Sequence, residues 1–354
     1  MTLDQEKEDL VAWLHTALAI ELSTIPVYMT ALISIKPGSN RVPANLIRGV
    51  MMEEMLHLAL AGNLLSAIGG KAAFFEANIP TYPLTLKFDG KTFRGREFAI
   101  ELAPFSAQNT EVFTQIEYPD VWSEPGAELT GVSEVDVPGY TIGGFYAAIA
   151  TKLAQLCEEF GEPTVFSGDP QHQLGLNYYW AGGGRPILIT DLVSAKRAID
   201  LIVSQGEGSD QTVFDRDASD FGQPEDAAHF FRFREIQYAQ SYRKGDDPRQ
   251  PPTGNRFEVD YSAVYPIKVN PKQADYSEDL MLAKLNMEFN ALYTRMLTQI
   301  ADAFNGAPAS MYTAILNSMH GMTGIALQMV ATPIANDPEG RHGAPSFEWV
   351  EPLA

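Results

Sequence analysis

Apolar residues recur every three or four positions over most of this chain, the pattern that amphipathic helices produce. The segment 42–68, which contains MMEEMLHLALAGN, shows the pattern most clearly, and Gly69-Gly70 ends it. An earlier helical segment contains Pro26, a kink site, and ends at KPGSN. We predict four long helices, of which the first two should pack antiparallel, at about 3–35, 42–68, 140–160 and 224–243.

Shorter apolar repeats predict three additional helices, the first of them capped by Asp191, at about 191–205, 277–304 and 309–331. Between the second and third long helices, Asp89-Gly90 separates LTLKF from KTFRGREFAIEL, as in a two-residue β-hairpin. The order of helix pair, long crossover and helix pair is that of a ferritin-like four-helix bundle. We therefore predict a mainly α fold that forms a single domain over 1–354, with small β-hairpin insertions and additional C-terminal helices.

The charge of the chain limits its partners. Acidic residues outnumber basic ones by 45 to 25, whereas nucleic acids and anionic membranes require a basic surface. Cys157 is the only cysteine, so no internal disulfide forms and a reducing compartment is favoured. The N-terminus lacks a signal-peptide pattern, and no apolar run is expected to span a bilayer. We predict a cytoplasmic protein that binds neither nucleic acid nor membrane, and the C-terminal helices allow an oligomer.

Two ionisable residues lie on the apolar face of the 42–68 helix. On a helical wheel, Glu54 and His57 share one side with Ile47, Val50, Leu58, Ala61 and Leu65. Residues three apart are neighbours on a helix, so the carboxylate and the imidazole face the same way. Carboxylate oxygens and imidazole nitrogens together suit iron, manganese or zinc. The pair predicts a metal site with additional ligands on other helices.

The first and fourth helices carry the ligand types that such a site needs. In ferritin-like metal sites two helices each contribute one carboxylate and two contribute Glu-x-x-His. Glu21 is the acid on the apolar face of the first helix, and a lone buried carboxylate is costly. Asp226 and His229 repeat the three-residue spacing in the fourth helix. We predict Glu21, Glu54, His57, Asp226 and His229 as metal ligands, and all of these except Asp226 as catalytic residues.

Several of these residues have alternative explanations. Glu53 also lies one turn from the histidine of its helix and can replace Glu54. Asp226 lies in a first helical turn, where the helix dipole alone favours acids. Glu21 can pair with an arginine, and His229 can be a hydrogen-bonded core histidine.

The third helix lacks the acid that a symmetric dinuclear site requires. TIGGFYAAIATKLAQL contains no carboxylate, and Glu158 and Glu159 come only at its far end. The site then holds one metal or an asymmetric pair, unless an acid from outside the helix, such as Glu134 or Asp136, reaches in.

Four segments resemble the ferritin-like family that includes the iminophenyl-pyruvate dimer synthases of bisindole (violacein and rebeccamycin type) biosynthesis. They are AIELSTIPVYMTALISI, EEMLHLALAGNLLSAIGG, YYWAGGGRPILITDLVSAKRAIDLIVSQGEG and HFFRFREI, and the resemblance extends over about 10–350. It implies a ferritin-like bundle and iron-dependent oxidative chemistry, which in the dimer synthases couples two imines derived from indole-3-pyruvate. This chain is far shorter than those synthases.

The resemblance also assigns site residues by position. Glu21, Glu54 and His57 match the acid, acid and histidine of the family. The second acid-x-x-histidine of the family matches Asp226 and His229, with Asp where Glu is usual. Gly144 stands where TIGEFY-type members carry an acid, which argues against a symmetric dinuclear centre.

We therefore expect a non-haem iron oxidoreductase, mononuclear or dinuclear, that acts with dioxygen or peroxide on a small substrate such as an amino-acid derivative. Manganese and zinc are alternatives to iron. The expected substrate pocket is lined by Tyr28, Tyr146, Phe230 and Phe233, with Arg232 as a carboxylate clamp, although core packing and an ion pair also explain these residues. Two other interpretations are a metal-binding or storage protein without turnover and a degenerate scaffold that has lost the metal.

Overall fold

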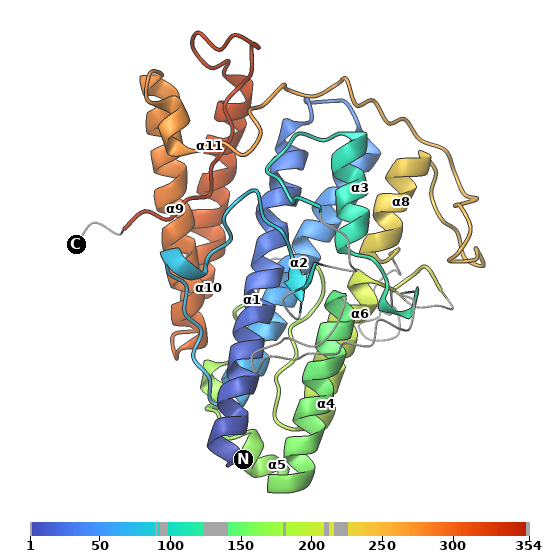
Figure 1. Ribbon diagram of the computed structural model, residues 1–354, viewed down its shortest axis with the longest axis vertical. Helices are drawn as coiled ribbons and strands as arrows, with labels where there is room; N and C mark the ends of the chain where they lie inside the picture. The colour runs from blue at the N-terminus through green and yellow to red at the C-terminus, as the bar shows by residue number, and fades with distance from the viewer. Residues whose placement is uncertain are drawn as a thin grey trace.

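The computed structural model describes residues 2–88, 91–92, 98–122, 141–179, 182–208, 212–215 and 226–351, and these are mainly helical (Figure 1). The longer helices are α1 (Leu3–Ser34), α2 (Arg41–Ala67), α4 (Ile142–Phe160), α6 (Leu192–Gly206), α9 (Leu280–Phe304) and α11 (His320–Ala331). The shorter ones are α3 (Ala107–Ile116), α5 (Glu162–Val165), α8 (His229–Tyr238) and α10 (Ser310–Thr313). Single 3-10 turns lie at Glu76–Asn78, Asp120–Trp122, Pro170–His172 and Gln273–Tyr276, and a π-helical turn, Ala314–Met319, joins α10 to α11.

Most of the predicted helices are present close to their expected bounds. Asp191 caps α6 as predicted, since its Oδ1 accepts a hydrogen bond from the Ser194 N–H at 2.8 Å. The helix predicted at 224–243 is shorter than expected, because α8 begins only at His229. The one predicted at 309–331 is divided by the π-helical turn. Helix α3 lies in the segment that the sequence pattern left without a helix.

Helices α1 and α2 form the central pair on which the others pack. Helix α4 packs on α1, and α6 packs on both α4 and α2, which closes a four-helix bundle. Along the same pair, α3 and α8 pack on each other, and α8 also contacts α2 and α6. In Figure 1, α3 lies above α4 and α8 lies above α6. The third position of the bundle is therefore shared by α4 and α3, and the fourth by α6 and α8.

Helices α9 and α11 form a second layer on the other side of the central pair (Figure 1). Helix α9 contacts α2, and α11 contacts α1. Gly62 permits the close approach of α9, because a Cβ at this position would lie 2.2 Å from Cζ of Phe304. The core of the protein thus continues from the bundle into the C-terminal helices.

The only strands in the described part of the chain are very short. Strands β1 (Lys87–Phe88) and β2 (Lys91–Thr92) pair antiparallel, with Lys87 opposite Thr92. The turn predicted at Asp89-Gly90 lies outside the described residues.

Helix α1 corrects the expectation that no apolar run is long enough to span a bilayer. It is long and apolar enough to do so, but 72% of its most apolar stretch is buried inside the protein. This burial, together with the partners that α1 has in α2, α4 and α11, is that of a core helix.

Candidate metal centre

Five buried ionisable side chains meet between the central pair and the shorter helices. Each exposes at most 4% of its surface. They are Glu21 from α1, Glu54 and His57 from α2, Glu117 directly after α3, and His229 at the first position of α8. The structure thus brings together four of the residues predicted as ligands and adds Glu117.

The Glu54 carboxylate lies between the two histidines. Its Oε1 is 2.8 Å from Nδ1 of His229 and 3.8 Å from Nδ1 of His57. On the outer sides, Oε2 of Glu21 lies 3.7 Å from Nδ1 of His57, and Oε2 of Glu117 lies 3.5 Å from Nδ1 of His229. The imidazole rings are stacked with their centroids 5.3 Å apart. The cluster therefore consists of two similar halves, each with a histidine and an outer acid, that share Glu54.

The outer nitrogen of each histidine has a hydrogen-bond acceptor. Nε2 of His57 lies 3.1 Å from Oε1 of Gln205, and Nε2 of His229 lies 2.9 Å from Oε2 of Glu53. These acceptors place the proton of a neutral imidazole on Nε2 and leave the Nδ1 lone pair directed at the carboxylates. Nδ1 of His229 thus lies 2.8 Å from Oε1 of Glu54 and close to a second carboxylate oxygen. A buried nitrogen and a carboxylate oxygen in such contact fit a shared cation.

Each of the three carboxylates is also oriented by a hydroxyl group. The oxygen that faces away from the histidines accepts a hydrogen bond, from Tyr146 to Glu21 at 2.5 Å, from Tyr28 to Glu117 at 2.5 Å, and from Thr24 to Glu54 at 2.9 Å. The second oxygen of each acid is left to face the cluster. Such outer hydrogen bonds orient metal ligands and tune their basicity.

The cluster shifts the pKa values of its members in the metal-free protein. Burial and the nearby Glu117 raise the pKa of Glu54 to about 7. Burial lowers the pKa of His229, but the surrounding carboxylates, Glu117 foremost, outweigh it and raise that pKa well above its usual value. Burial is likewise outweighed at His57, whose pKa Glu21 and Glu54 raise. The acids thus favour positive charge at the centre.

Glu53, the alternative ligand to Glu54, faces a different partner. Both of its oxygens contact Nη2 of Arg232, at 2.9 and 3.0 Å, and one also accepts from Nε2 of His229. Burial opposes ionisation, but Arg232 and His229 keep the pKa of Glu53 below its usual value. Arg232 is itself buried, and its Nε donates to the carbonyl of Ala227. The arginine predicted as a substrate clamp therefore orients Glu53, which in turn orients His229.

Asp226 does not join the cluster, contrary to the prediction. Its side chain is exposed, and it precedes α8, whose N-cap is Ala228. The spacing of Asp226 and His229 is therefore not that of neighbours on a helix.

Glu117 supplies the acid that α4 lacks. The sequence pattern did contain a signal for it, because SAQNTEVFTQIE starts with an N-cap serine and places Phe113 and Ile116 on one apolar face just before the acid. Along α1, Glu21 contacts α4 through Tyr146, and Tyr28 contacts Glu117 two turns later. A side chain at Gly144 would displace the carboxylate of Asp120, since a Cβ there would lie 2.9 Å from its Oδ1. The alternatives Glu134 and Asp136 lie outside the described residues.

The aromatic residues predicted to line a substrate pocket are packed in the core. Tyr28 contacts Phe113 and Phe233, with ring centroids 4.9 and 5.3 Å apart. Phe230 packs edge-on against Trp122 at 5.3 Å. The hydroxyl groups of Tyr146 and Tyr28 donate hydrogen bonds to two acids of the cluster.

The loop that contains Gly182, Gly183 and Gly184, here called the glycine loop, lies beside the residues that contact His57. Nε2 of Gln205 donates to the carbonyl of Gly183 at 3.0 Å, which orients the amide that faces His57. Gly183 has a φ of +75°, and a Cβ there would lie 2.7 Å from the carbonyl oxygen of Met52. Only glycine lets this loop lie against the α2 backbone beside the ligands.

Comparisons with known proteins agree with this architecture. The ferritin-like family model matches residues 14–238, which contain all five residues of the cluster, and the chain belongs to the ferritin-like family. Dichlorochromopyrrolate synthase of Lentzea aerocolonigenes is 26% identical over 328 residues, which cover 86% of this chain and 29% of that protein. The chain thus spans less than a third of the length of this relative. The crystal structure of a ferritin-like protein from Caulobacter vibrioides matches with a TM-score of 0.64 and 24% identity, over 96% of this chain and 98% of the other, and shows the fold.

Proposed function

We propose that this protein is a non-haem iron-dependent oxidoreductase that acts on a small, amino-acid-derived substrate. One observation supports it above all: an oxygen of Glu54 and a ring nitrogen from each of His57 and His229 lie within 4.8 Å of one another. Glu21 lies beside His57 and Glu117 beside His229, and the remaining polar atoms of these five side chains have other hydrogen-bond partners. Carboxylate-rich sites with two imidazoles suit iron, and manganese or zinc less specifically.

In this proposal Glu21, Glu54, His57, Glu117 and His229 hold the metal. Bound iron would supply redox chemistry with dioxygen or peroxide. Gln205 and Glu53 keep the imidazoles in the tautomer that presents Nδ1, and Tyr28, Tyr146 and Thr24 keep the acids turned inward. The buried position excludes bulk water, which strengthens every electrostatic interaction at the site.

The relatives support the proposed substrate class. The family resemblance and the name of the relative in Lentzea favour aromatic amino-acid derivatives such as indole-pyruvate imines. Because the chain spans only 29% of that protein, the reaction of the relative is not transferred as such.

The test is anaerobic reconstitution with Fe(II), followed by metal analysis and by oxygen uptake with and without aromatic amino-acid imines. We expect tight iron binding and oxygen uptake that accelerates with a substrate imine. The variants His57→Ala and His229→Ala should lose both the iron and the uptake. A wild-type protein that binds no iron tightly under these conditions would refute the proposal.

A metal-storage role is the second candidate, and the burial of all five ligands favours it, since they expose at most 4% of their surface. Storage predicts that iron is oxidised equally well without any organic substrate. It also predicts that each chain accumulates more iron than the two halves of the cluster can hold.

A further inference from the structure

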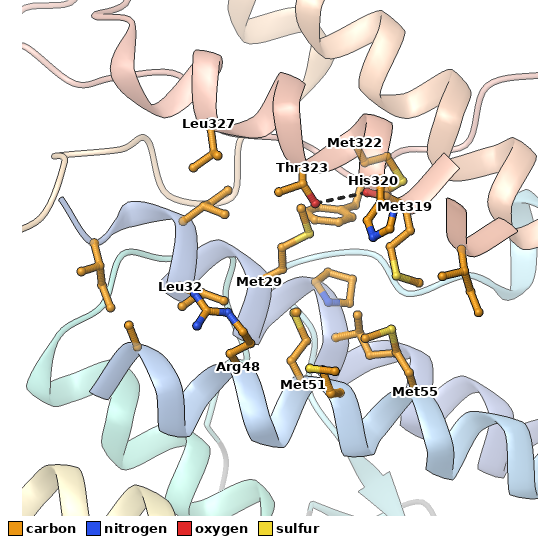
Figure 2. A pocket seen from close by; sticks show the side chains of 18 of the residues that line it. Met29, Leu32, Arg48, Met51, Met55, Met319, His320, Met322, Thr323 and Leu327 are labelled. Atoms are coloured by element: carbon orange, nitrogen blue, oxygen red, sulfur yellow. Dashed lines mark hydrogen bonds between the residues drawn. The ribbon is translucent and has the colours of Figure 1, made fainter. Parts of the chain in front are cut away.

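A large apolar pocket lies on the other side of the central pair, between α1 and α2 and the C-terminal helices. Its volume is about 810 Å³, within the usual range for small-molecule sites. In Figure 2 the pocket is enclosed by Met29 of α1 and by Met51 and Met55 of α2, facing Met319 and Met322 from the C-terminal layer. None of the five residues of the cluster lines the pocket, so the pocket is separate from the cluster.

The wall of the pocket is unusually rich in methionine. Seven of the twelve methionines of the chain line it, together with leucine and isoleucine side chains. Methionine is flexible and polarizable, and it packs well against aromatic and alkyl groups of varied shape. The π-helical turn contributes Ile315, Leu316 and Met319 to this wall, and such turns are frequent at functional sites.

The mouth of the pocket is positively charged. Lys36, Arg41 and Arg48 line it and are exposed, as is His320. No aspartate or glutamate of the described residues lines the pocket, although acids outnumber bases by 45 to 25 in the chain. In a protein of net charge −20, this local excess of cations favours an anionic group at the mouth.

The interior also offers a free hydrogen-bond donor. Tyr293 lines the pocket and is 1% exposed, and its hydroxyl has no hydrogen-bond partner among the described residues. A buried hydroxyl without a partner is costly, and a polar atom of a ligand would satisfy it.

We propose that this pocket binds a small amphipathic anion. The aromatic or alkyl body of the ligand packs among the methionines, a polar atom on it accepts from Tyr293, and its carboxylate or sulfonate binds Arg41 and Arg48. Arginine is suited to this because its guanidinium binds such anions through two parallel hydrogen bonds. The inference goes beyond the proposed function and does not depend on a bound metal.

Two fluorescent dyes that share one body test the charge requirement in the metal-free full chain. 1-Anilinonaphthalene-8-sulfonate carries the anion, and N-phenyl-1-naphthylamine lacks it. In the double variant Arg41→Ala/Arg48→Ala, we expect the Kd of the sulfonate to rise by about tenfold or more, as loss of charge-assisted hydrogen bonds requires. The neutral dye should bind as to wild type, and Arg197→Ala, an exposed arginine on α6, should change neither. Equal effects on both dyes, or none, would overturn the proposal.

Tryptophan substitutions test the location. Thr323→Trp fills the pocket from an exposed position on α11, and Met55→Trp fills it from α2. Both should prevent binding of both dyes, while thermal melting shows that the fold persists. Thr323 is exposed, so its variant is the one that tolerates the larger side chain best. Unchanged dye binding in a folded Thr323→Trp protein would place the dyes elsewhere and refute the assignment. None of these outcomes bears on iron binding.

Discussion

Each side chain of the cluster is oriented by a hydrogen bond to a residue outside it. Glu21, Glu54 and Glu117 each give one oxygen to a hydroxyl group and keep the other for the centre. The histidines are oriented in the same way by Gln205 and Glu53. Since these partners are themselves buried or backbone-bound, the ligands lose little conformational freedom when a metal binds.

His229→Ala tests the cluster against a matched neighbour, Asp226→Ala. The histidine is fully buried and contacts three carboxylates, whereas Asp226 is exposed and precedes the helix. We expect His229→Ala to lose the bound metal and Asp226→Ala to keep the wild-type metal content, as measured by elemental analysis of protein reconstituted under identical conditions. Loss of metal in Asp226→Ala would show that Asp226 is a ligand, contrary to its exposed position in the structure.

Metal affinity should decrease as the pH falls. The neighbouring carboxylates outweigh burial and raise the pKa of both His57 and His229, so each imidazole holds a proton over a wider pH range than usual. A metal must displace these protons, and its affinity then falls by up to about tenfold per pH unit for each proton displaced, as the pH drops through the raised pKa values. Competition with a chelator between pH 6 and pH 8, using Co²⁺ or Zn²⁺, measures this. An affinity that is constant over this range contradicts it.

Two of the five residues of the cluster come from the ends of short helices. Helix α3 ends at Ile116, just before Glu117, and α8 begins at His229, so one acid and one histidine come from helix ends. The other three ligands come from within α1 and α2. The glycine loop and the C-terminal end of α6 close the site on the His57 side.

Gly183→Ala tests how closely this loop must approach α2. The new Cβ would lie 2.7 Å from the carbonyl oxygen of Met52, at a φ of +75°. Gly245→Ala is the control, because Gly245 has a φ of +91° but nothing within 4 Å of the added atom. We expect the control to lose about 1 kcal/mol of unfolding free energy from backbone strain alone, and Gly183→Ala to lose about 2 kcal/mol more through the clash. Denaturant unfolding measures both, and equal losses would show that the loop is free to move.

A metal bound at the cluster should stabilise the complete fold. The cluster joins α1, α2, α8 and the end of α3, so a bound ion links helices that are distant in the chain. We expect about 2.7 kcal/mol of added stability when free metal is 100 times its Kd. Differential scanning calorimetry with and without metal measures the increase in Tm, and His57→Ala should show none. A melting temperature that metal leaves unchanged in the wild type argues against a site in the native fold.

The periodicity of apolar residues determined the helical fold and much of the cluster. Helix geometry is local, so the three-residue spacing of Glu54 and His57 was enough to place both on one face. Glu21 was predictable because it is an ionisable side chain within an otherwise apolar helix face. His229 was predicted from its three-residue spacing to Asp226, although α8 begins only at His229 and Asp226 lies outside it. These predictions needed no knowledge of how the helices pack.

Tertiary structure decided which acids complete the site. Glu53 and Glu54 are adjacent on α2, and only the position of Arg232 on α8 directs Glu53 outward. Asp226 is excluded because α8 starts three residues after it, and Glu117 enters because α3 ends beside His229. These outcomes depend on contacts between residues far apart in the chain, as does the pocket between α1, α2 and the C-terminal helices. No periodic pattern within one helix records such contacts.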